Sequence, residues 1–275
     1  MSALSFADNL VAVTLKPGER VGDPAVLDVE PDAGCLAVSS SVETVGATPA
    51  TASPAPPAGS ADDVRLEREP GSNEARLTGR LPMGGAWSGR LAVADPARCA
   101  VATFRGVLES KGIRIMGGVS TSREPLPAGA RVLAEHDSPS MAEIVRVVNK
   151  ESQNLHAEAL LRLVGLKVKG EGSAEKGHEA VTELARRLGV PDEGWGLADG
   201  SGLARTDLLT PRGLVALLLA MDRHPHAAAF RDSLPVAGVD GTLEDRMKGT
   251  VAEGGKGREA VAAIDAIAVA LAAAR

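Results

Sequence analysis

The periodicity of the hydrophobic residues changes near Asp95, and this change constrains the fold more than any other feature of the sequence. Before Asp95, short alternating segments such as Asn9 to Leu15 and Val26 to Glu30 end at turns that contain proline or glycine, which is typical of β-strands. After Asp95, apolar residues recur three and four positions apart, which is typical of amphipathic helices. No regular β-α-β alternation and no internal repeat is present. The sequence therefore predicts an α+β protein that is β-rich first and helical afterwards.

The β-rich part contains one segment of different composition. Thr48 to Ala61 is rich in proline, alanine and serine and has no periodicity, so we expect a flexible linker or an exposed loop there. Beyond the linker, Val64 to Glu69 and Glu74 to Arg80 predict a hairpin around the turn Pro70 to Asn73. We place this β-rich region at residues 1–132.

Helix start signals define the second part. Asp95 and Pro96 predict a first helix that ends at Gly112, followed by a short strand from Ile113 to Met116. Residues 133–275 form the predicted helical domain. Its helices are expected to begin at Ser138, after a polar interruption from Asn149 to Asn154, at Ser173, at Thr210 and at Glu259.

Composition excludes several classes of protein. A net charge of −6 argues against non-specific binding of nucleic acid, and no apolar run approaches the roughly 18 residues of a membrane span. Two cysteines, Cys35 and Cys99, are too few for a disulfide-dense scaffold or a four-cysteine zinc site; they could pair or stay free. His224 and His226 lack a further ligand at a usual spacing, so we expect no metal and no cofactor. Met1 to Val13 has no basic region and does not resemble a signal peptide.

Serines with a base or a lysine nearby are candidate nucleophiles, because a free hydroxyl is a poor nucleophile at neutral pH. The only Ser-x-x-Lys is Ser173 to Lys176, where a lysine one helical turn away could take the serine proton. Ser173 occupies an N-cap position and Lys176 lies on a charged face, so we predict capping and surface charge instead. Gly200-Ser201-Gly202 resembles part of a nucleophile elbow, but Asp199 stands where a glycine is needed, which favours a tight turn.

The polar break between two predicted helices carries the chain's only Ser-x-Asn, at Ser152 and Asn154. A hydroxyl and an amide on such a loop can point together into a cleft, where the serine relays a proton and the asparagine holds a substrate carbonyl or a lysine. The alternative is structural: an asparagine that ends a helix, with a capping serine.

The residues around this triplet carry a resemblance to a known family. Glu143 to Glu158 looks like the second active-site motif of the penicillin-binding D-alanyl-D-alanine carboxypeptidase/endopeptidase family, the class C group or peptidase family S13. Further matches cover most of the chain. In the family's order they are Gly172 to Gly177, Leu197 to Arg205, Leu209 to Pro211 and Leu234 to Leu243, and two upstream segments, Leu4 to Asn9 and Asp95 to Gly118, resemble the β-rich insertion of these enzymes.

The resemblance implies acyl transfer on the D-Ala-D-Ala end of peptidoglycan stem peptides in the cell envelope or periplasm. In the family, a serine of Ser-x-x-Lys attacks, its lysine accepts the proton, the serine of Ser-x-Asn helps to protonate the leaving D-Ala, and a Lys-Thr-Gly strand binds the terminal carboxylate. Ser152 and Asn154 map onto the second motif and are the catalytic residues that the resemblance implies. Intact members also bind β-lactams.

Two of the three motifs do not map onto this chain. The nucleophile motif is expected before the region that matches Leu4, and no Lys-Thr-Gly or Lys-Ser-Gly occurs anywhere. Lys256 runs directly into a segment that resembles the family's closing helix, so the core strands between are expected to be missing. We therefore expect a shortened family member, an incomplete transpeptidase-like domain with little or no hydrolysis. The alternatives are a non-catalytic binding or interaction protein of the cell envelope, and a truncated gene product without independent function.

Overall fold

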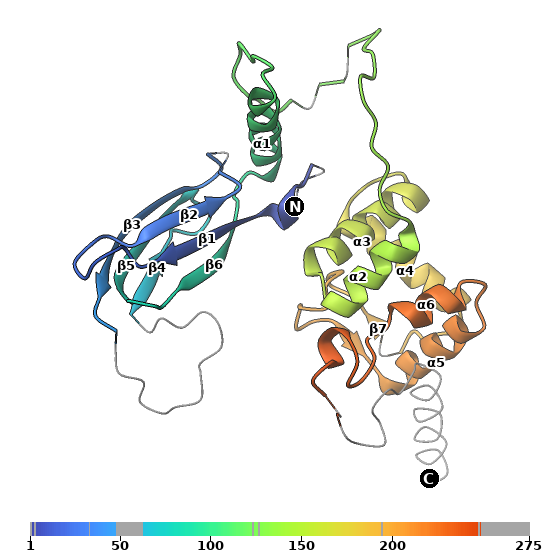
Figure 1. The fold of residues 1–275 in the computed structure, drawn as a ribbon. Coiled ribbons are helices and arrows are strands. Elements are labelled where there is room, and N and C mark those ends of the chain that lie inside the picture. The colour runs from blue at the N-terminus through green and yellow to red at the C-terminus, as the bar shows by residue number, and fades with distance from the viewer. Residues whose placement is uncertain are drawn as a thin grey trace. The chain divides into compact units, whose positions relative to one another are not determined.

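The computed structural model describes residues 2–248, apart from residues 3, 33, 48–62, 123, 126, 194 and 247. The chain divides into two compact units, Met1–Ala130 and Arg131–Arg275. Within the described residues, the first unit contains two three-stranded sheets and one long helix, and the second contains five helices and one small sheet (Figure 1). The predicted α+β class is thus confirmed.

The first unit is built from two sheets of different connectivity. In the first sheet, a central strand pairs with antiparallel neighbours on both sides; its strands are β1 (Leu10–Lys16), β2 (Val26–Glu30) and β6 (Trp87–Ala92). In the second sheet, the central strand β5 (Glu74–Pro82) pairs antiparallel with β4 (Val64–Glu67) and parallel with β3 (Ala37–Val45).

The inner faces of the two sheets share one hydrophobic core. Alternation along β1 turns Val11, Val13 and Leu15 inward, and all three are fully buried. Leu77 and Leu81 of β5 are equally buried and belong to the same cluster, so the two sheets pack face to face. Burial of each such side chain is worth about 1.5–3 kcal/mol, which makes these central strands the stable part of the unit.

A disulfide joins a helix to this core. The helix α1 (Pro96–Ser110) begins as predicted at Asp95, whose carboxylate accepts the backbone N–H of Arg98 at 3.0 Å. In its first turn, Cys99 is buried in the core cluster and bonded to Cys35 with an S–S distance of 2.11 Å. Of the two possibilities that the sequence left open, the cysteines thus pair, and α1 is covalently tied to the sandwich.

The second unit consists mainly of helices. They are α2 (Met141–Glu151), α3 (Asn154–Lys169), α4 (Ala174–Arg187), α5 (Pro211–Asp222) and α6 (Ala227–Ser233), with the short strands β7 (Trp195–Gly196) and β8 (Leu208–Leu209). A 3₁₀ turn, η2 (Gly241–Leu243), follows α6, and another, η1 (Ala7–Asn9), precedes β1 in the first unit. None of the described helices is long and apolar enough to cross a membrane.

Two glycines bring α3 and α4 close together. A Cβ on Gly177 would lie 2.3 Å from the carbonyl oxygen of Leu161, and one on Gly165 would lie 2.7 Å from the backbone nitrogen of Gly177. Both glycines are buried. The two helix backbones therefore touch at a place that admits no side chain.

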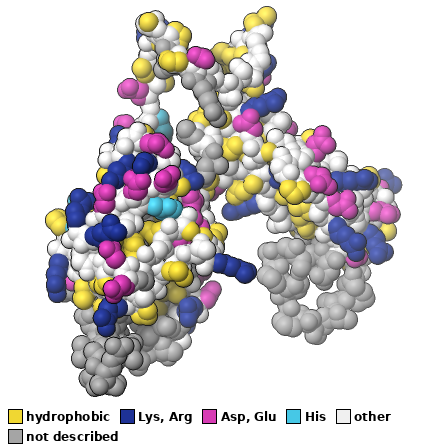
Figure 2. All heavy atoms as spheres, turned by 180° about the vertical axis from the view of Figure 1, so that it is seen from behind, with side chains coloured by type: hydrophobic (Ala, Val, Ile, Leu, Met, Phe, Trp, Pro, Cys, Tyr) yellow, Lys and Arg dark blue, Asp and Glu magenta, His cyan; other side chains and the backbone are white. Residues whose placement is uncertain are grey.

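On the surface, acidic and basic side chains are interspersed, as the face in Figure 2 shows.

Several predicted elements need correction. Ile113 to Met116 forms no strand. The helix expected to begin at Ser138 begins after Ser140, because Ser140 and Glu143 form a reciprocal capping box. The polar segment Asn149 to Glu151 belongs to α2, so the break is only Ser152 and Gln153. The strands β3 and β6 were not predicted. The proposed linker at residues 48–61 and the helix expected from Glu259 lie outside the described residues.

Candidate functional site

Ser152 and Asn154 lie at the two-residue connection between α2 and α3, which consists of Ser152 and Gln153. Ser152 is the residue after α2 and has left-handed backbone angles (φ 56°, ψ 52°), while Asn154 is the first residue of α3. Both side chains are exposed. The structural alternative is thus only half right, because the serine ends a helix but the asparagine begins the next one. A hydroxyl and an amide, separated by the single residue Gln153, are thus presented to solvent here.

The last turn of α2 is tied to the segment after α6. The Lys150 ammonium donates to the Asp240 carboxylate at 2.6 Å and to the Leu234 carbonyl at 2.9 Å. The hydrogen bond from Lys150 holds the pKa of Asp240 below its usual value, and the backbone N–H of Val236 adds to the effect. Asp240 is therefore ionised at neutral pH and stays paired with Lys150.

The first turns of α3 are tied to a different segment. One carboxylate oxygen of Glu158 accepts the backbone N–H groups of Gly200 at 2.7 Å and Ser201 at 3.2 Å, and the other pairs with Arg162 at 2.5 Å. Partial burial alone would raise the pKa of Glu158, but these donors outweigh it and lower the pKa. Gly200 is close enough to α3 that a Cβ would lie 3.0 Å from the Ala157 carbonyl oxygen.

The Gly200-Ser201-Gly202 segment is a turn organised by Asp199, as predicted. The Asp199 carboxylate accepts hydrogen bonds from the Gly202 N–H (2.6 Å), the Ala204 N–H (2.9 Å) and the Ser201 hydroxyl (3.1 Å). Desolvation opposes the charge, yet these bonds keep the pKa of Asp199 below its usual value. The Ser201 hydroxyl thus donates to the carboxylate of its own turn, and this hydrogen bond helps to fix the turn. The geometry is structural.

Ser173 and Lys176 take the capping role that the sequence predicts. The Ser173 hydroxyl accepts the backbone N–H of Lys176 at 3.2 Å and so caps α4. The Lys176 ammonium points to Glu179, 2.7 Å away, and this hydrogen bond raises the pKa of the lysine. A lysine that acts as a base toward serine must lose its proton easily, so this pair is arranged against nucleophilic catalysis.

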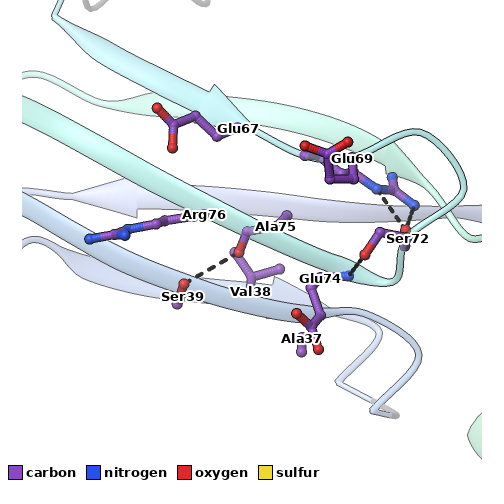
Figure 3. Close-up of a pocket in the computed structure, with 10 residues that line it drawn as sticks. Ala37, Val38, Ser39, Glu67, Glu69, Ser72, Glu74, Ala75 and Arg76 are labelled. Atoms are coloured by element: carbon purple, nitrogen blue, oxygen red, sulfur yellow. Dashed lines mark hydrogen bonds between the residues drawn. The ribbon is translucent and has the colours of Figure 1, made fainter.

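Grooves lie in both units of the described structure. In the second unit, an apolar groove of about 620 Å³ lies between α2 and α3, and neither Ser152 nor Asn154 lines it. Its lining residues are Pro139, Glu143, Ile144, Arg146, Val147, His156, Ala159, Leu160 and Leu163. In the first unit, a groove of about 510 Å³ with both charged and apolar lining residues lies on the second sheet, where Ser39, Arg76 and Glu67 are neighbours across β3, β5 and β4 (Figure 3). No predicted site residue lies in it.

Metal ligands are not grouped in the part of the chain that the structure describes: no three histidine, cysteine, aspartate or glutamate side chains are placed to share an ion. The rings of His224 and His226 lie 5.3 Å apart without a third ligand among the described residues.

Sequence reasoning missed the residues that hold the Ser152 connection. Lys150 was interpreted as part of a polar interruption, and Asp240 and Glu158 only as parts of family matches. Their roles depend on pairings over 90 residues (Lys150 to Asp240) and 42 residues (Glu158 to Gly200). The signal in the sequence was an ionisable residue next to Ser-x-Asn on a helix with an apolar face.

Comparison with known proteins agrees with the resemblance. The sequence model of the D-Ala-D-Ala carboxypeptidase 3 (S13) family matches residues 1–258. The D-alanyl-D-alanine carboxypeptidase of Actinomadura sp. (strain R39) is 40% identical over 204 residues, which are 72% of this chain and 38% of that protein. The D-alanyl-D-alanine carboxypeptidase DacB of Haemophilus influenzae is 30% identical over 140 residues, 50% of this chain and 29% of that protein.

Solved structures agree in fold. The crystal structure of penicillin binding protein 4 (dacB) from Haemophilus influenzae matches 92% of this chain and 54% of its own with a TM-score of 0.70 and 21% identity. A structure of the same protein complexed with a novel β-lactam matches with a TM-score of 0.68. The chain thus spans less than two fifths of these two curated relatives and about half of the solved chains.

Proposed function

The chain belongs to the D-Ala-D-Ala carboxypeptidase 3 (S13) family, and on this premise we propose that it carries part of the machinery with which a serine carboxypeptidase acts on the D-Ala-D-Ala end of peptidoglycan stem peptides. The family match over residues 1–258 is the observation that carries the proposal. Ser152 and Asn154 are the residues of this chain that take part in the chemistry.

Their roles follow from their chemistry and placement. After a serine nucleophile has attacked the peptide carbonyl, the leaving D-Ala nitrogen needs a proton, and the exposed Ser152 hydroxyl relays it. The Asn154 amide donates to a substrate carbonyl and holds it in register. The connection is suited to these roles because both flanking helices are anchored. On one side α2 is bonded to Asp240, and on the other side α3 is bonded to Gly200.

The 275-residue chain by itself forms no acyl-enzyme. Its only Ser-x-x-Lys has a lysine whose pKa is raised by Glu179, and the sequence contains no Lys-Thr-Gly or Lys-Ser-Gly to bind the substrate carboxylate. Nucleophile activation and substrate positioning are both required for acylation. A β-lactam is therefore expected to leave the protein without covalent modification.

The test is incubation of the purified chain with a fluorescent penicillin, followed by intact-mass spectrometry. The expected result is an unmodified mass from a protein that unfolds cooperatively. Ser152→Ala and Ser173→Ala serve as matched variants: an adduct that disappears in one of them identifies an activated serine and refutes the proposal of inactivity. Release of D-Ala from a stem peptide would refute it equally.

The cell envelope is the proposed location. Disulfides persist in oxidising compartments such as the bacterial periplasm and the cell exterior, and the Cys35–Cys99 disulfide joins a half-buried cysteine to a buried one in the first unit. Alkylation of free thiols in intact cells, before and after reduction, tests the proposal. Thiols that react without reduction would contradict it.

A second function, binding to the cell envelope without catalysis, is favoured by the structure of the first unit. This unit has its own core and a disulfide, while the catalytic motifs are incomplete. Co-sedimentation of the full chain with purified peptidoglycan separates the two: binding without any penicillin adduct favours this function, and absence of binding excludes it.

A further inference from the structure

The connection between α2 and α3 is held in an unfavourable backbone conformation. Ser152 has φ 56° and ψ 52°, the left-handed region that non-glycine residues rarely adopt. Its N–H, and that of Gln153, both donate to the carbonyl of Val148. Because such a conformation persists only where the surroundings determine it, the neighbours of this connection must hold it in place.

The neighbour on the α2 side is a largely buried lysine. The Lys150 side chain is only 11% exposed, and its ammonium contacts two acceptors, the Asp240 carboxylate and the Leu234 carbonyl. Asp240 is itself held, since its second oxygen accepts the Val236 N–H at 2.8 Å. An ammonium with two acceptors in a compact loop has little freedom to move along the helix axis.

A second contact limits rotation of the same turn. The Asn149 amide donates to the Ser233 hydroxyl at 2.8 Å, and Ser233 is completely buried and donates in turn to the Phe230 carbonyl. At Gly241, a Cβ would lie 2.8 Å from the Lys150 carbonyl oxygen, so the loop contacts the α2 backbone itself. Two successive residues of α2 are thus bonded to one downstream segment, residues 233–241.

We propose that Lys150 and Asp240 are positioning residues for the Ser152–Asn154 connection: their ion pair sets the end of α2 and thereby the direction of the Ser152 hydroxyl and the Asn154 amide. This inference rests on the proposed function of these two side chains. Lys150 and Asp240 touch no substrate in this role; they act through Ser152.

A purely stabilising ion pair would have a different effect. Loss of such a pair lowers the stability of the whole unit and leaves the native conformation of Ser152 unchanged. Loss of a positioning pair changes the connection itself in the folded protein. Lys169 and Glu183 provide a matched control, since their ion pair of 2.5 Å joins α3 and α4 in the same unit without contacting the connection.

The experiment is solution NMR of the full chain with Lys150→Met, Asp240→Asn and the control Lys169→Met. In both test variants, amide exchange at Ser152 and Gln153 is expected to accelerate at least tenfold. The Ser152 Cα and Cβ shifts and its N–H to Hα coupling are expected to lose their left-handed values. Amides within α4 are expected to keep their exchange rates. Lys150→Arg, which retains a donor to Asp240, is expected to restore the Ser152 signals, and Lys169→Met to leave them unchanged.

Unchanged Ser152 signals in a folded Lys150→Met or Asp240→Asn variant would overturn the inference, as would equal changes in Lys169→Met. If Lys150→Met does not fold, the isosteric Asp240→Asn decides alone. The readout requires no acylation. It is therefore independent of the penicillin test, and failure of this inference can be told apart from failure of the proposed function.

Discussion

Gly241 occupies a position where both backbone angle and space exclude other residues. Its φ is +60°, and a Cβ would meet the Lys150 carbonyl oxygen at 2.8 Å and the Pro235 side chain at 3.0 Å. We expect Gly241→Ala to destabilise the second unit by about 2–3 kcal/mol, from the strained angle and the overlap together. Chemical denaturation measures this loss.

Gly202→Ala separates the cost of the strained backbone angle from the cost of the steric overlap. Gly202 has a comparable φ of +76°, but a Cβ there would meet nothing within 4 Å, so only the angle opposes alanine. We expect a loss of about 1 kcal/mol there. Equal losses at Gly241 and Gly202 would show that the contact with Lys150 contributes nothing.

The carboxylate of Asp240 predicts a dependence of stability on pH. Its pKa is lowered in the folded protein, chiefly by the hydrogen bond from Lys150. A lowered folded pKa contributes stability that is fully present above the unfolded value of about 3.9 and is lost as the pH falls through the folded pKa. We therefore expect Asp240→Asn to be less stable than the parent at pH 7, and the difference to shrink below about pH 4. Urea denaturation at several pH values measures it, and a constant difference would contradict the assignment.

Single residues show where sequence reasoning succeeds and where it stops. The caps at Asp95 and Ser173 were predicted because a cap acts on its own helix within three residues. Ser140 was missed in favour of Ser138, although Glu143 three residues later is the sequence mark of a capping box. The partner of Lys150 could not be predicted, since Asp240 is brought to it only by the packing of the folded chain.

At the scale of elements, the contact between α3 and α4 depends on the absence of side chains. Gly177→Ala would place a Cβ 2.3 Å from the Leu161 carbonyl oxygen and 2.7 Å from Leu161 Cγ, and the carbonyl, as backbone, cannot move aside as the end of a flexible side chain could. We expect the helices to be forced apart at a cost of about 1–3 kcal/mol.

Gly106→Ala in α1 is the control for this substitution. It is also a helical glycine, but nothing lies within 4 Å of the place that its Cβ would take, so alanine is expected to stabilise α1 by up to about 1 kcal/mol. Thermal denaturation of the two variants should therefore shift in opposite directions. A stabilising Gly177→Ala would mean that the helices are not in close contact.

Elements differ in how well their own sequences predict them. The strands β1 and β2 and the hairpin of β4 and β5 follow local alternation and turn residues, and all were predicted near their observed bounds. The strand β3 was missed because Ser39, Ser40 and Ser41 interrupt its pattern and only Val42 and Thr44 are buried. Its partner β5 runs parallel to it and lies beyond the proposed linker. Pairing of this kind is set by the assembled core, not by neighbouring residues.

At the scale of the whole molecule, the disulfide distinguishes the two units. Cys35 and Cys99 are 64 residues apart, and closing a loop of this length in the unfolded chain is worth roughly 4 kcal/mol in the chain-entropy account. Both cysteines lie in the first unit. A reductant is therefore expected to lower the denaturation midpoint of the first unit and leave that of the second unchanged.

The two tryptophans make this measurable. Trp87 lies in the core of the first unit and Trp195 lies in the second. The Trp195→Phe variant therefore reports on the first unit alone, and the Trp87→Phe variant reports on the second unit alone. With reductant, the Trp87 transition should move to lower denaturant concentration. A matching movement of the Trp195 transition would show that the second unit depends on the first for its stability. The double variant with Cys35→Ala and Cys99→Ala is the control. It has no disulfide, so any shift that the reductant still causes in it has another origin.

The same bond also determines what happens when the chain is cut. A protease that hydrolyses one peptide bond anywhere between Cys35 and Cys99, the proposed linker included, produces two polypeptides that remain one covalent molecule. Electrophoresis would show a single species without reductant and two fragments with it. The first unit can therefore lose the continuity of its backbone without losing any of its parts.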